Sequence, residues 1–337
     1  MKNKLILLLL VLVVTLPSFA EYKIYDLVDE KGNKLTQTSL ELSTGDVYIS
    51  EDNREFEVVS VENDQVKVRQ TGVVDLSTYL TMPLDIQVGG KKPIIGIYHT
   101  HSDESYLPGE ASQPYPGEIY EVGKALKESL EAEGFDVKWS QANHNPHDGT
   151  AYNRSRDTAA KLLRNNPVTL IDVHRDAIPD PNIYKTDVNG QSAAKVRIVT
   201  GKQNQNRTSN FEYAKAIKAH ADNNYPGIIE GIFWAKGNYN QDIGPRTILL
   251  EFGTHVLTLD DALVSAKKFG AVIAQTLPQG GGRGERLGAR SGIFWVLLIG
   301  IVGTAIFLLI NKNGLEAFKN LGERFTHSLR RRRREKP

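Results

Sequence analysis

The chain has 337 residues, 40% of them apolar, which is enough for one large domain or two smaller ones. Its net charge of +1 hides an acidic middle: residues 21–291 hold 30 Lys/Arg and 37 Asp/Glu, a balance of −7, which argues against nucleic acid as a partner. The absence of cysteine excludes disulfides, thiolate catalysis and cysteine-ligated zinc.

Residues 1–20 have the pattern of a secretory signal peptide. Two lysines precede an apolar run over 5–16, and Ser18 and Ala20 supply the small residues that a signal peptidase recognises. An uncleaved membrane anchor is the alternative. In both cases we expect the body of the protein to lie outside the cytoplasm.

Residues 21–90 are predicted to form a small β-rich accessory domain. Short strand-like runs, "DVYIS" (46–50), "EFEVVSV" (55–61) and "DQVKVRQ" (64–70), are separated by turn residues. The segment "VGGKKP" (88–93) is typical of a domain boundary.

Residues 91–279 change to a rhythm in which strands and helices alternate. The expected strands cover 94–99, 135–139, 168–174, 194–201, 228–235 and 246–253, and the expected helices cover 118–133, 151–165, 208–223 and 259–276. Alternation of this kind, with nearly continuous apolar strands, predicts an α/β domain whose mostly parallel sheet is flanked by helices.

The C-terminal part is predicted to anchor the protein in a membrane. After a Gly/Arg linker (280–291), residues 292–310 form an uncharged apolar run, and 19 residues at ~1.5 Å each span the hydrocarbon core as one helix. The tail, 311–337, holds nine Lys/Arg and three Glu, so we expect it to be cytoplasmic.

Four of the expected strands in the α/β domain end in polar residues. Strand 94–99 leads into "HTHSDE", strand 168–173 into "HRD" and strand 231–235 into "KGNYNQD", while Glu251 follows 247–250. Because ligands bind at the carboxyl ends of parallel strands, we expect these segments to share one edge of the sheet.

The residue types at this edge fit a zinc site. His101 and Glu104 have H-x-x-E spacing, and His174 supplies a third ligand from a separate strand. Two histidines and a glutamate form a known catalytic set that leaves one coordination position for water. His99 competes with His101 for the first position. If it does not bind the metal, it is expected to donate a hydrogen bond to a residue that does.

Glu251 is a candidate general base. It follows an apolar strand, and partial burial would raise the pKa of its carboxyl toward that of a base for water activated by zinc. The alternative is a salt bridge with Arg246 or Arg175. Arg175 and Asp176 flank His174, whereas Asp172 precedes it and is expected to alternate away; one of these residues is a candidate to orient the imidazole of His174.

A polar loop after 231–235 is a candidate substrate site. Asn238, Asn240 and Gln241 carry amides that suit recognition of peptides or sugars, and an ordinary polar turn is the alternative. Arg175 and Arg246 are further candidate substrate contacts.

Several motifs resemble, in order, those of the stage II sporulation protein P family. They are "IYHTHSDESY", "NHNPHDGTAYNRSR", "DVHRDA", "AKVRIVTGKQNQN" and "IFWAKGNYNQDIGPRTILLEFGTH", and the resemblance covers roughly 93–276. That family is similar to zinc-dependent N-acetylmuramoyl-L-alanine amidases, so the resemblance implies an amidase-like fold of the phosphorylase/hydrolase type. It also implies His101, Glu104 and His174 as the zinc set and Glu251 as the catalytic acid.

The activity implied by the resemblance is peptidoglycan hydrolysis. The bond cleaved is the amide between N-acetylmuramic acid and the L-alanine of the stem peptide, with endopeptidase activity on cross-links as a second activity. A lytic transglycosylase and a membrane protein are the implied partners. Two alternatives are a zinc carboxypeptidase or endopeptidase acting on wall peptides, and a wall-binding scaffold without catalysis.

Overall fold

The computed structural model describes residues 23–81 and 92–277. The predicted signal peptide (1–20), linker (280–291), transmembrane helix (292–310) and basic tail (311–337) all lie outside these residues. Among the helices that are described, none combines the length and the apolar character needed to cross a membrane.

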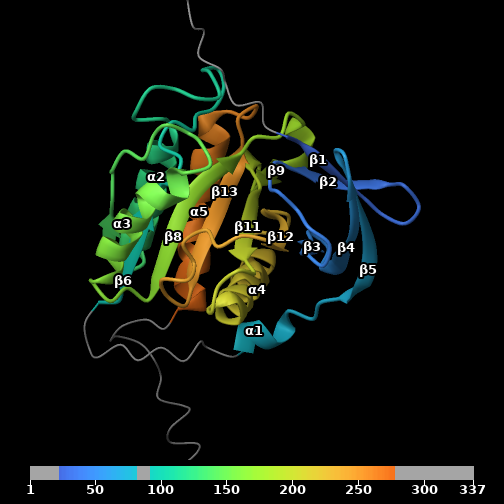
Figure 1. Cartoon of the computed structure of the whole chain (residues 1–337). Helices are drawn as coiled ribbons and strands as arrows, with labels where there is room; N and C mark the ends of the chain where they lie inside the picture. The colour runs from blue at the N-terminus through green and yellow to red at the C-terminus, as the bar shows by residue number, and fades with distance from the viewer. Residues whose placement is uncertain (1–22, 82–91, 278–337) are drawn as a thin grey trace, which may run out of the picture. The chain divides into compact units, whose positions relative to one another are not determined.

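One large sheet runs through the described part of the chain. Its strands lie in the order β2-β1-β5-β4-β3-β12-β11-β13-β8-β6-β7 (Figure 1). Their bounds are β1 Tyr25–Val28, β2 Lys34–Thr38, β3 Val47–Ser50, β4 Arg54–Glu62, β5 Gln65–Val73, β6 Ile94–Tyr98, β7 Asp136–Trp139, β8 Thr169–Asp176, β11 Val196–Gly201, β12 Ile229–Ala235 and β13 Thr247–Thr254. A separate hairpin pairs β9 (Lys185–Val188) with β10 (Gln191–Ala194).

The α/β architecture predicted for the second part of the chain is present. The helices are α1 Ser77–Thr81, α2 Ile119–Ala132, α3 Ala151–Leu163, α4 Arg207–Asn224 and α5 Leu259–Thr276, with a 3₁₀ turn, η1, at Pro181–Ile183. The four long helices lie close to the predicted ranges. The beginning of α5 is set by a capping box, in which Thr258 and Asp261 bond to each other's backbone N–H.

The sheet is mostly parallel among the six strands after residue 92, with one reversal. The pairs β6–β7, β6–β8, β8–β13 and β11–β12 are parallel, whereas β11 and β13 are antiparallel. The carboxyl ends of β6, β8 and β13 therefore share an edge, and β12 ends at the opposite one. This corrects the expectation that the polar loop after β12 would start from the same edge.

The N-terminal strands continue the same sheet. β3 pairs antiparallel with β12, with Ile49 opposite Ile232, and β1–β5 follow outward from there. A hydrophobic cluster joins Phe56 and Val68 of these strands to Phe233 and Ala235 of β12. This part is β-rich as predicted, but its core is shared with the α/β part, and the boundary expected at 90–91 lies outside the described residues.

The two faces of the sheet carry different residues because side chains alternate along a strand. On β8, Ile171 and Val173 belong to the main hydrophobic core, which also contains the buried residues of α2, α4 and α5. Leu170 instead packs with Ala159 and Leu162 of α3 on the other face. The even-numbered residues of β8 therefore face α3, and that face holds the polar site.

Candidate metal centre

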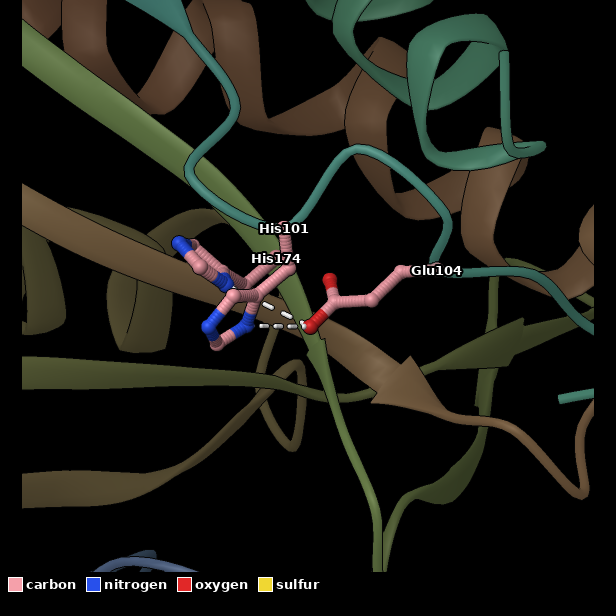
Figure 2. Close-up of side chains that lie close together, drawn as sticks. All are labelled: His101, Glu104 and His174. Carbon is pink, nitrogen blue, oxygen red and sulfur yellow. Dashed lines mark hydrogen bonds and ion pairs between the residues drawn. The ribbon is translucent and has the colours of Figure 1, made fainter. Parts of the chain in front are cut away.

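Three side chains from two segments converge on the α3 face of the sheet. Nδ1 of His101 lies 3.0 Å from Oε1 of Glu104, and Nδ1 of His174 lies 3.4 Å from the same oxygen (Figure 2). One ligand atom from each of the three residues can be chosen so that all lie within 4.8 Å of one another. The structure thus brings together the three residues that the sequence predicts as zinc ligands.

The local structure explains how each side chain reaches the cluster. His174 is near the end of β8, and its side chain faces α3, as those of the other even-numbered residues of this strand do. His101 and Glu104 lie in the turn that follows β6, and this turn is held by a bridge between Glu104 and Ser112. The second oxygen of Glu104 accepts a hydrogen bond from the backbone N–H of Arg175 at 2.9 Å, which ties the turn to β8.

The donor set and its spacing fit zinc. Ligand atoms at ~2.1 Å from a tetrahedral zinc ion lie roughly 3.4 Å from one another. The two measured distances to Glu104, 3.0 and 3.4 Å, are close to that value. Two imidazoles and one carboxylate leave a fourth position for water or substrate.

The two imidazoles of the cluster have pKa values shifted in opposite directions. Burial lowers the pKa of His101 to about 4, although its hydrogen bond to Glu104 acts in the opposite direction. Burial also acts to lower the pKa of His174, but the carboxylates of Asp172 and Glu104 raise it to about 10. Burial acts to raise the pKa of Glu104, but the charges of His174 and Arg175 and the hydrogen bonds with His101 and His174 together hold this pKa well below its ordinary value. In the metal-free protein, a proton on His174 therefore balances Glu104.

Asp172 is the residue that orients His174. Its Oδ1 lies 3.0 Å from Nε2 of His174, while its two oxygens also accept hydrogen bonds from the backbone N–H and hydroxyl of Thr100. This corrects the expectation that Asp172 alternates away: residues two apart on a strand share a face, so its position in β8 places Asp172 beside His174. The contact with Asp172 is an ion pair in which Nε2 makes no hydrogen bond to a described residue, and Nδ1 is the nitrogen that faces Glu104.

His99 does not join the cluster. Its ring lies on the same face of the sheet as the odd-numbered residues of β6 and packs against α2. The centre of this ring is 4.4 Å from that of Tyr120. Nδ1 contacts the carbonyl of Val173 at 3.2 Å, and Nε2 accepts a hydrogen bond from Nε1 of Trp139 at 3.0 Å. Both nitrogens are thus engaged away from the metal ligands, because the chain turns between His99 and His101.

Glu251 lies next to His174 in the sheet. The two residues are register partners on the parallel strands β13 and β8. Oε2 of Glu251 accepts a hydrogen bond from the hydroxyl of Tyr184 at 2.9 Å. Burial and the carboxylate of Asp176 raise the pKa of Glu251 to about 8, although Arg197 acts in the opposite direction.

The cluster and Glu251 open into one pocket of about 600 Å³. Residues 39–41, from the loop after β2, form one wall, so the N-terminal part of the chain contributes to the site. The ring of His147 stacks on that of His101 at 3.7 Å, and Nδ1 of His147 contacts Asp103 at 3.1 Å. Tyr152, from the start of α3, lines the pocket as well. The sequence offers no local signal for Tyr152 or for residues 39–41.

The residues predicted to bind substrate have different surroundings. Asn238 and Arg175 line the pocket, but the guanidinium of Arg175 donates to the backbone carbonyls of Ser105, Asp176 and Ala111.

The amide of Asn240 donates to Tyr152 and Ser155 of α3, and that of Gln241 donates to the carbonyl of Val199. The guanidinium of Arg246 donates to the carbonyl of Val168. These three residues hold loops in place and do not line the pocket.

A protein-family model described as "Stage II sporulation protein P (SpoIIP)" matches residues 20–274. The stage II sporulation protein P of Bacillus subtilis (strain 168) is 28% identical over 260 residues, which are 71% of this chain and 62% of that protein. The match thus spans less than two thirds of that relative's length.

Solved structures with partial likeness include three amidases. The N-acetylmuramoyl-L-alanine amidase AmiC2 of Nostoc punctiforme has a TM-score of 0.38 at 15% identity, over 56% of this chain and 97% of that one. The CwlD amidase of Clostridioides difficile, solved with the GerS lipoprotein, has 0.38 at 13%, over 55% and 96%. The amidase Ami1 of Mycobacterium smegmatis has 0.36 at 16%, over 55% and 94%.

Proposed function

Since the chain belongs to the stage II sporulation protein P family, we propose that it is a zinc-dependent peptidoglycan hydrolase. The bond cleaved is the amide between N-acetylmuramic acid and the L-alanine of the stem peptide. The observation that carries this proposal is the pocket in which His101, Glu104 and His174 converge beside a buried glutamate, Glu251.

Each residue has a role that follows from its surroundings. His101, Glu104 and His174 would hold the zinc, and Asp172, 3.0 Å from Nε2 of His174, would keep that ring in position. Zinc bound there supplies Lewis-acid polarisation of the scissile carbonyl and activation of a water. Glu251 accepts the proton of the attacking water and passes it to the amine that leaves, a task that suits a carboxyl whose pKa is raised to about 8.

The assay uses the full chain, purified in detergent with zinc, and purified peptidoglycan. Analysis of the products by mass spectrometry is expected to detect intact stem peptides released from sugar strands, and chelation is expected to stop their release. Glu251→Gln is expected to abolish release, while Glu131→Gln, on the exposed side of α2, serves as a matched control. Equal activity of the Glu251→Gln variant and the wild type would contradict the proposal.

The same products separate the two alternatives. Trimmed or uncrosslinked stems that stay attached to sugar identify a carboxypeptidase or endopeptidase. Binding of peptidoglycan without any cleavage, and without stoichiometric zinc, identifies a scaffold. The intact set of two histidines and two glutamates in the pocket favours catalysis.

We further propose a location and partners. The predicted helix at 292–310 crosses the cell membrane once, with the catalytic part outside and the basic tail in the cytoplasm. A lytic transglycosylase that cuts the sugar strands and a membrane protein are the proposed partners, and sporulation is the proposed setting. Protease added to intact protoplasts is expected to remove the catalytic part and to spare an epitope placed after residue 337. Protection of the catalytic part would contradict this topology.

A further inference from the structure

A fully buried arginine lies behind Glu251. Arg197, on β11, is the register partner of Glu251, and its Nη1 is 3.7 Å from Oε2 of Glu251. The same guanidinium lies 2.5 Å from Oδ2 of Asp176 and 2.7 Å from Oε2 of Glu230. A buried charge network of this kind is tolerated only when its members are held in one geometry by further hydrogen bonds.

Tyr184 joins this network to the pocket. Its hydroxyl lies 2.9 Å from Oε2 of Glu251 and 3.1 Å from Oδ2 of Asp176, and its ring is fully buried. The 3.7 Å contact with Arg197 is too long for a hydrogen bond. Among the described residues, Tyr184 therefore provides the hydrogen bond that fixes the carboxyl of Glu251.

Tyr184 is itself held rigidly. It follows η1 and packs in a small apolar cluster with Ile178, Ala194 and Leu257. The guanidinium of Arg197 lies 4.8 Å from the centre of its ring, within the range of a cation–π contact. The phenol thus has little freedom to follow Glu251 if the carboxyl moves, and this rigidity is what positioning requires.

The N-terminal part of the chain completes the network from the other side. The hydroxyl of Ser39 donates to Oδ1 of Asp176 at 2.7 Å. Nη2 of Arg197 donates to Oγ1 of Thr36 at 3.0 Å and to the carbonyl of Gln37 at 2.8 Å. Residues 36–39 therefore contact both groups that surround Tyr184 and Glu251.

We propose that Tyr184 is a positioning residue for Glu251, and that residues 36–39 hold Tyr184's partners, Asp176 and Arg197, in place. The N-terminal strands then act on catalysis through this network, as well as by forming a wall of the pocket. This inference rests on the proposed function, because Tyr184 is assigned to position Glu251 for the catalytic role proposed above.

The first test is Tyr184→Phe in the full chain, with a soluble peptidoglycan fragment that carries one stem peptide. Removal of the hydroxyl is expected to lower kcat about 10- to 100-fold, as loss of an orienting partner does. KM is expected to stay within about twofold, because Tyr184 does not contact the substrate. Tyr213→Phe removes the hydroxyl of an equally buried tyrosine on α4 that does not line the pocket, and is the matched control.

A double-mutant cycle separates positioning from a general loss of structure. Glu251→Asp shortens the side chain by one methylene and withdraws the carboxyl from Tyr184. If Tyr184 acts through Glu251, adding Tyr184→Phe to Glu251→Asp changes kcat by less than about twofold. A full additional loss in the double variant, or an unchanged kcat in Tyr184→Phe alone, would overturn the assignment.

The proposed role of residues 36–39 is tested with Ser39→Ala. It is expected to lower kcat in the same way as Tyr184→Phe but less, about 3- to 10-fold, with an unchanged zinc content, since it acts through Asp176. An unchanged kcat would overturn the assignment of residues 36–39. A wild-type chain without zinc-dependent cleavage would instead refute the proposed function, so the two failures are distinguishable.

Discussion

Glu251 and His174 are register partners on β13 and β8, and both side chains open into the same pocket. A candidate metal ligand and a buried acid are thus fixed beside each other by the sheet itself. His101 and Glu104 come from the turn after β6, whereas the positions of Glu251 and His174 are set by β13 and β8.

We expect His101→Ala to lose bound zinc and His99→Ala to retain it. His101→Ala removes a ligand atom, so stoichiometric zinc is lost while the fold is retained. His99→Ala keeps the ligands but removes the partner of Trp139 and Val173, and a buried group left without a partner costs about 1–3 kcal/mol of the free energy of unfolding. Metal analysis by mass spectrometry and denaturant unfolding measure the two effects. Retention of zinc by His101→Ala would show that the first ligand is another residue.

Asp172→Asn is expected to weaken zinc binding without abolishing it. The carboxylate beside Nε2 of His174 orients the ring, and loss of such a partner lowers metal affinity about 10- to 100-fold. Competition with a chelator of known affinity measures the change. Asp187→Asn, on the exposed β9–β10 hairpin, is the matched control. The same zinc affinity in the Asp172 and Asp187 variants would exclude an orienting role.

The metal-free protein is expected to lose stability as the pH rises from 6.5 to 8, above the range in which the lowered pKa values of His99 and His101, about 4 each, act in the opposite direction. Burial and Asp176 raise the pKa of Glu251 to about 8, from an ordinary value of 4.5. Between these values the unfolded chain has released a proton that the folded chain still holds, so the free energy of unfolding falls with increasing pH. Glu251→Gln removes this contribution, and its curve is expected to fall less over the same range. Denaturant titrations in the presence of a chelator measure both curves, and parallel curves would refute the shift.

Deletion of residues 23–75 is expected to prevent the rest of the chain from folding to a soluble form. The deletion removes β3 and so exposes the edge of β12, and it uncovers Phe233 and Ala235. Solubility and circular dichroism measure the effect, with Val73→Ser, at an exposed site on β5, as the control. A soluble, folded protein after deletion of residues 23–75 would show that the N-terminal strands form an accessory domain.

Much of the fold and the ligand set is visible in the sequence because these features are local. Helical periodicity marks α2 and α5, and the apolar runs mark the strands after residue 92. The spacing of His101 and Glu104, together with a histidine at another strand end, indicates a zinc site. Parity within a strand explains why Asp172 belongs beside His174, and the same parity places His99 on the opposite face.

The sequence by itself determined the types of element, the identity of the three candidate ligands and the presence of an acid after an apolar run, although β13 continues past Glu251 to Thr254. The tertiary structure alone decided which strands are neighbours. It reversed β11 and β12, joined the N-terminal strands to the sheet, and brought Ser39, Asp176 and Tyr184 to Glu251. The physical reason is that these contacts join residues more than 60 positions apart in the chain or depend on strand order, and neither leaves a periodic trace in the sequence.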